Sequence, residues 1–97
     1  MKQGETHIDL IKIAQAQFPN TIQLDGFDEA IIGLSLRVNN VSNYVYSVNK
    51  IIICIMRDGN NYEEAVEHFF YNIKPLEDID KNNSPFFYDD RPHFSLN

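Results

Sequence analysis

The chain has 97 residues, of which 43% are hydrophobic, and it carries a formal net charge of −6. This length predicts one domain, residues 1–97, and the hydrophobic content excludes a disordered chain. The acidic balance argues against direct nucleic-acid binding, because phosphate binding needs clustered Lys and Arg. No run approaches the ~18 apolar residues of a membrane helix, and the N-terminus lacks a signal-type hydrophobic region, so we expect no membrane contact and a cytoplasmic location.

The N-terminal part of the chain predicts a helix over roughly His7–Phe18, with Thr6 as its N-cap and residues 1–5 flexible. Residues 21–24 alternate weakly and predict a short strand, and Asp25-Gly26 predicts a turn. The expected apolar stripe of the helix contains Ile8, Ile11, Ala14 and Phe18, widened by Leu10 and Ile13.

A β-hairpin is predicted next. From about Ala30 to Val38, apolar residues occupy every second position, which is the period of a strand. A helix that begins at Asp28 is the alternative, because Asp-Glu-Ala makes a good first turn. Asn39-Asn40 is the candidate turn, and residues 43–47 are rich in β-forming side chains. We therefore expect residues 30–38 to pair with residues 43–47.

Two helices in an αα-hairpin should follow. Ser47 is a suitable N-cap for a helix over about Val48–Arg57, and Gly59 is the left-handed residue that ends it. That helix is apolar nearly all round, so we expect it to be the most buried one. Cys54 lies within it, where a small buried hydrophobe in a reducing compartment is more plausible than a reactive thiol.

The second helix of the hairpin is expected over residues 61–73, with a capping box between Asn61 and Glu64. Its apolar face, which should organise the core, contains Tyr62, Ala65, Val66, Phe69, Phe70 and Ile73. Lys74-Pro75 should end this helix, because the residue before proline avoids the α region.

The C-terminal part should be a loop over residues 74–85, a short strand at the sheet edge over Phe86–Tyr88, and a flexible tail over residues 89–97. The predicted fold class is thus α+β. It consists of an N-terminal helix, a β-hairpin, an αα-hairpin and a short C-terminal strand.

Three segments of the central block, FDEAIIGLSLR, YVYSVNKIIICIMRDG and NYEEAVEHFFYNI, carry a family pattern. With them, residues 27–73 resemble a family of small proteins encoded by tailed bacteriophages. No activity is assigned to that family, so the resemblance implies a phage origin and no particular mechanism. The matching positions are Asp28, Glu29, Ala30, Gly33, Tyr46, Lys50, Asp58, Gly59, Glu63, Glu64, Ala65, Phe69 and Asn72.

Two groups of polar residues could in principle carry chemistry. Glu64 and His68 are four residues apart on one helix face, but a solvated face is the favoured interpretation, and we expect no metal and no other cofactor. Further ligands would have to come from Glu67, Asp89, Asp90 and His93. An acidic cluster of Asp25, Asp28 and Glu29 is the basis for the alternative of a small enzyme or ligand-binding protein, although turn and cap chemistry is the favoured interpretation of these residues.

Aromatic residues exceed what one small core needs, so they either anchor a partner or close the open face of the sheet. They are Tyr44, Tyr46, Phe86, Phe87, Tyr88 and Phe94.

The leading hypothesis is a non-enzymatic binding protein, a phage-type inhibitor of a host protein or defence nuclease with a basic surface. A structural oligomer is a further alternative, and a homodimer is possible. The predicted partner-binding residues are Glu77, Asp78, Asp80, Phe86, Phe87, Tyr88, Asp89 and Asp90.

Overall fold

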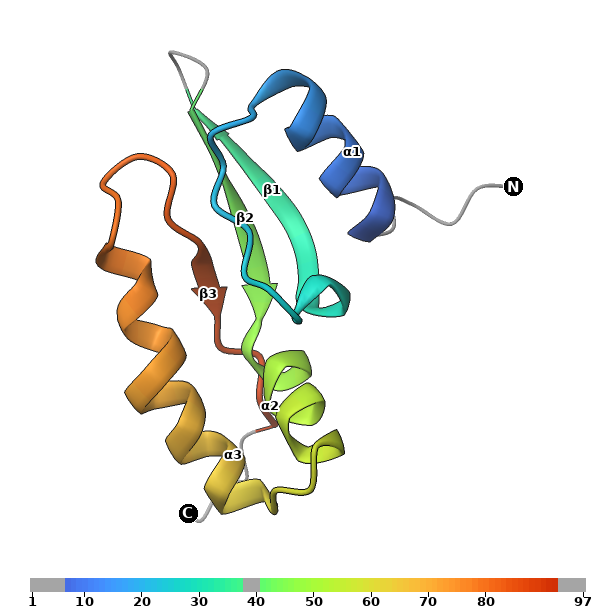
Figure 1. Cartoon of the computed structure of the whole chain (residues 1–97), viewed down its shortest axis with the longest axis vertical. Coiled ribbons are helices and arrows are strands. Elements are labelled where there is room, and N and C mark those ends of the chain that lie inside the picture. Colours follow the sequence, from blue (N-terminus) through green and yellow to red (C-terminus); the bar gives the residue numbers. More distant parts are fainter. Residues whose placement is uncertain (1–6, 38–40, 93–97) are drawn as a thin grey trace.

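The computed structural model describes residues 7–37 and 41–92. It contains three α-helices and a three-stranded sheet, and it confirms the predicted α+β class (Figure 1). In chain order the elements are α1 (His7–Gln17), the 3₁₀ turn η1 (Asp28–Ala30), β1 (Ile31–Arg37), β2 (Val41–Ser47), α2 (Val48–Arg57), α3 (Tyr62–His68), η2 (Phe69–Ile73), η3 (Lys74–Asp78) and β3 (Phe86–Tyr88).

The sheet has the order β1-β2-β3. The predicted hairpin is confirmed, because β1 and β2 pair antiparallel with Leu34 opposite Tyr44 and a register shift between Ile31 and Gly33. The C-terminal strand joins the sheet edge as expected, parallel to β2, with Phe87 opposite Tyr46. The helix considered for residue 28 onward is reduced to the single turn η1. The candidate turn at residues 39–40 lies outside the described residues.

The strand predicted for residues 21–24 is wrong. These residues form no ladder, because their backbone groups bond to side chains and loops instead. The Leu24 N–H donates to the Tyr46 hydroxyl oxygen at 2.8 Å, and the Ile22 N–H donates to the Asn83 carbonyl at 3.1 Å. The turn at Asp25-Gly26 is confirmed, with Gly26 at a φ of 88°.

The apolar stripe of α1 is rotated from its predicted position. Leu10 and Ala14 are buried, whereas Ile8 is 53% exposed. The helix packs against β1 on one side, beside the strand rather than across the sheet, so only a narrow face is covered (Figure 1). Apolar residues on several sides of a helix do not by themselves indicate which side is buried.

Both predicted ends of α2 are confirmed. The Lys50 N–H donates to the Ser47 side-chain oxygen at 3.0 Å, and Gly59 has a φ of 105°, where only glycine is unstrained. Val48, Ile51, Ile52 and Ile55 are buried. It is the most buried of the three described α-helices, as expected, since α1 has two buried residues and α3 has one. Ile53 and Met56, on its other side, are 42% and 37% exposed.

The organising helix begins as predicted and ends later. Asn61 and Glu64 exchange two hydrogen bonds of 2.8 Å, which form the capping box. After α3 the helical path widens into the π-helical η2 and then tightens into η3, so the predicted loop begins only after Asp78. Pro75 does not end the helical path at residue 74, because it occupies the first turn of η3. The N–H groups of a first helical turn have no partner within the helix, so the N–H that proline lacks costs no hydrogen bond there.

The core runs from α1 through the sheet and α2 to α3 and η2. Ala65, Phe69 and Ile73 are buried along one line of the helical path. The Phe69 ring is edge-on to the Phe87 ring of β3, with centroids 5.3 Å apart. Tyr62 and Phe70, predicted for the same face, are 45% and 42% exposed at its margin. Within the described residues, no helix is long and apolar enough to cross a membrane.

Candidate interaction surface

Strand β3 separates its three aromatic side chains between the core and solvent. Phe86 is 40% exposed and Tyr88 is 59% exposed. Phe87 points the other way, because successive strand side chains alternate, and its ring packs between those of Tyr46 and Phe69. Two of the three predicted aromatic anchors are therefore accessible, and the third belongs to the core.

The acidic residues before β3 also divide into two kinds. Glu77 pairs with Lys74, and Asp78 is exposed at the end of η3. The Asp80 carboxylate accepts hydrogen bonds from the backbone N–H groups of Asn82 and Asn83 at 2.8 and 3.2 Å. These bonds stabilise the ionised form and lower the pKa of Asp80. Asp80 thus stabilises the conformation of the loop.

The two acidic residues after β3 differ in the same way. Asp89 pairs with Arg91, whose Nη2 lies 2.7 Å from the carboxylate. Asp90 accepts hydrogen bonds from the Ser47 hydroxyl at 2.6 Å and from the Asn49 N–H at 2.9 Å. It therefore holds the C-terminal segment against the first turn of α2. His93 and Phe94 lie outside the described residues.

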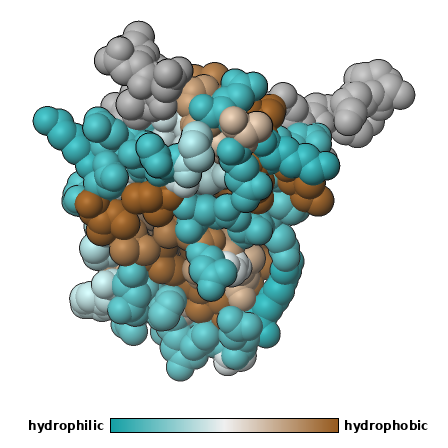
Figure 2. Space-filling model, turned by 45° about the horizontal axis from the view of Figure 1, so that its top comes forward, coloured by the Kyte–Doolittle hydropathy of each residue, from teal (hydrophilic) through white to brown (hydrophobic). Residues whose placement is uncertain are grey.

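Five of the eight predicted partner-binding residues lie around β3 with an exposed or partly exposed side chain that does not hold a loop or the start of α2. We call this set the β3 surface: Glu77, Asp78, Phe86, Tyr88 and Asp89. The other aromatic residues proposed as surplus close the core, because Tyr44 and Tyr46 are both buried. Figure 2 shows apolar residues reaching the surface in patches between hydrophilic ones on the face drawn.

The residues considered as metal ligands are engaged in local contacts. Glu64 completes the capping box of α3, and His68 Nδ1 lies 3.2 Å from the Asn72 side-chain nitrogen. Among residues 7–37 and 41–92, no group of three or more His, Cys, Asp or Glu side chains is arranged to hold a metal ion.

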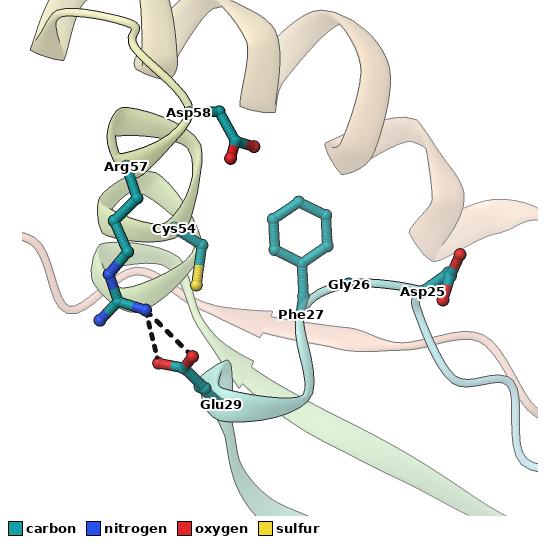
Figure 3. A pocket seen from close by; sticks show the side chains of 7 residues that line it. All are labelled: Asp25, Gly26, Phe27, Glu29, Cys54, Arg57 and Asp58. Carbon is teal, nitrogen blue, oxygen red and sulfur yellow. Dashed lines mark hydrogen bonds and ion pairs between the residues drawn. The ribbon is translucent and has the colours of Figure 1, made fainter.

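The acidic cluster near η1 borders an open groove of about 330 Å³ (Figure 3). Glu29 accepts two hydrogen bonds from Arg57 Nη1, at 2.8 and 3.0 Å, and Asp28 instead accepts one from the Gln23 side chain. Burial and the neighbouring Glu29 carboxylate raise the pKa of the half-buried Cys54 thiol. The groove is lined by Asp25, Gly26, Phe27, Glu29, Cys54, Arg57 and Asp58.

A second open groove, of about 350 Å³, lies between α1 and β1 and was not predicted from the sequence. The signal available was the alternation of Ile32, Leu34 and Leu36, which indicated a strand but not that two of these side chains stay exposed. The lining residues are Leu10, Ile13, Ile32, Gly33, Leu34 and Leu36, and we call this set the α1/β1 groove.

No protein-family model, curated protein or solved structure matches this chain.

Proposed function

We propose that this chain is a non-enzymatic binding protein, a phage-type inhibitor of a host protein or defence nuclease with a basic surface. The observation that carries the proposal is the β3 surface. Phe86 and Tyr88 project from an edge strand with 40% and 59% of their surface exposed, beside the carboxylates of η3 and Asp89. Exposed aromatic side chains are common anchors of protein interfaces, because they bury much area with few rotatable bonds.

Charge supports the same partner chemistry. The chain has a net charge of −6, so its field attracts basic surfaces and raises their association rate. Exposed carboxylates can occupy a basic channel in the place of nucleic-acid phosphates. Because such charges are screened beyond about 8 Å at physiological ionic strength, binding of this kind weakens with salt.

The groove beside η1 favours a small-ligand site as the second candidate. Its volume of about 330 Å³ suits a small molecule. The groups that line it, however, are poorly suited to catalysis. Glu29 is already paired with Arg57, and the raised pKa of Cys54 keeps its thiol protonated at neutral pH. The binding-protein proposal is therefore the stronger one.

Affinity capture with matched variants tests the proposal. The wild-type chain, Tyr88→Ala and Tyr71→Ala are each immobilised, exposed to host lysate and read by quantitative mass spectrometry. Tyr71 is a more accessible tyrosine, 79% exposed against 59% for Tyr88, that lies on η2 outside the β3 surface.

The proposal predicts a captured protein with a basic surface that is lost with Tyr88→Ala, retained with Tyr71→Ala, and released by salt. Loss with Tyr71→Ala alone would place the interface on the helical face instead. Turnover of a small molecule by the purified chain without any partner would contradict a binding protein altogether.

A further inference from the structure

Strand β1 has an outer edge that no other strand pairs with among the described residues. It is seven residues long and pairs with β2 on one side only, and among the described residues its other side has no backbone partner. Residues 32–36, IGLSL, contain neither a charge nor a proline. Folded proteins usually protect long edge strands with such residues, because an open edge accepts any added strand.

The opposite edge strand, β3, is less able to pair with an added strand. Strand β3 has only three residues, follows the buried Pro85, and is succeeded at once by Asp89. The short length of β3 discourages strand addition there, whereas a flanking charge does not distinguish the two edges, because β1 itself ends in Arg37. The contrast singles out β1 as the edge that is open to pairing.

An apolar groove accompanies the open edge. The helix α1 lies alongside β1 on the side away from β2 (Figure 1), and the α1/β1 groove of about 350 Å³ runs between them. Ile32 and Leu36 are 42% and 59% exposed in its wall, and Leu10 and Ile13 line it from the helix. One wall is thus a helix face, and the other is a strand whose outer N–H and C=O groups have no backbone partner in the part of the chain that the structure describes.

These features define the chemistry of the occupant. An extended backbone matches the repeat of unpaired backbone groups along a strand, and an added strand directs every second side chain into the groove. The lining side chains are all uncharged, whereas the whole chain carries −6. Alternating apolar side chains therefore suit the groove, and flanking Lys or Arg suit the field around it. We propose that the α1/β1 groove binds an extended basic-flanked peptide segment of a partner protein, which adds to β1 as a fourth strand.

A second copy of the chain fits this edge less well. Antiparallel pairing of two β1 strands around a two-fold axis keeps both α1 helices on the same side of the joint sheet, above the shared seam. Because α1 lies beside β1 rather than over the sheet centre, each helix would meet the other at that seam. A peptide brings no helix of its own. This proposal does not rest on the β3 surface.

Selection from a random seven-residue peptide library tests it. Enriched peptides are synthesised, and their binding sites are mapped on the full chain by ¹H–¹⁵N chemical shifts. We expect enriched peptides to alternate apolar residues, to carry Lys or Arg at their ends, and to shift the amides of β1 and α1. N-methylation of one alternate set of peptide amides should abolish binding, whereas N-methylation of the other set should not, because only one set faces the edge.

Variants of the chain separate the two edges. Ile32→Lys combined with Leu36→Lys should weaken peptide binding at least tenfold, and the control Tyr88→Lys should leave it unchanged. If the double variant fails to fold by circular dichroism, the N-methyl series on the wild-type chain decides. No enrichment, shifts confined to β3, indifference to N-methylation, or a dimer through β1 in sedimentation experiments would each overturn the proposal.

Discussion

Replacing Phe69 by alanine tests the assignment of the core. The side chain is 1% exposed, and its ring is edge-on to both Phe70 and Phe87, with centroids 5.0 and 5.3 Å apart. Burial of a whole Phe contributes roughly 1.5–3 kcal/mol, and each edge-on contact adds about 0.5–1.5 kcal/mol. Together with the cavity left behind, Phe69→Ala should lower the free energy of unfolding by about 3–5 kcal/mol.

Urea unfolding followed by far-ultraviolet circular dichroism measures this loss. The matched control is Phe70→Ala, the adjacent residue of the same type, which is 42% exposed and has the Arg91 guanidinium 5.3 Å from its ring centroid. That variant should lose only about 1 kcal/mol, because its contacts are partly solvated. A loss below about 1 kcal/mol for Phe69→Ala, or one no larger than that of the control, would refute the placement of the buried face.

Three further predictions concern single residues. Gly59→Val should lower the free energy of unfolding by more than about 1–2 kcal/mol in urea, because a side chain is strained at a φ of 105°. Asp90→Ala should cost about 1 kcal/mol by the same measurement through its lost bonds at the start of α2, while Asp78→Ala should cost nothing measurable. Because the folded-state pKa of Asp80 is lowered, its stabilising contribution is present above about pH 4 and is lost as the pH falls through the folded pKa. Urea midpoints across this range should therefore depend on pH less in Asp80→Asn than in the wild type; identical profiles would show that Asp80 does not contribute.

Local signals in the sequence were sufficient where a few neighbouring residues determine the backbone. The cap at Ser47, the left-handed Gly59 and the capping box of α3 each depend on residues within one helical turn. The alternation of apolar residues over 30–38 is equally local, and together with the β-forming residues 43–47 it was sufficient to predict the hairpin. These features located the αα-hairpin and the sheet.

Features that depend on distant contacts could not be predicted. Residues 21–24 alternate like a strand, yet their backbone is bonded by Tyr46, 22 residues after Leu24. In the candidate site, Asp90 bonds to Asn49, 41 residues earlier, so its carboxylate is structural. Phe87 faces the core while Phe86 and Tyr88 face solvent, because side chains alternate along a strand. Which of the alternating positions faces the core is known only when β3 is placed in the sheet. The α1/β1 groove likewise requires the position of α1, which the apolar residues around that helix leave open.

The rates at which a captured partner associates with the chain and dissociates from it test the proposed binding function most directly. Surface plasmon resonance at increasing salt would compare the wild type, Asp78→Asn combined with Asp89→Asn, and Tyr88→Ala; Asp80 and Asp90 stay unchanged because they hold the fold. We predict that the charge variant slows association, that salt removes this difference, and that Tyr88→Ala chiefly speeds dissociation. Wild-type rates in both variants at every salt concentration would contradict binding through the β3 surface.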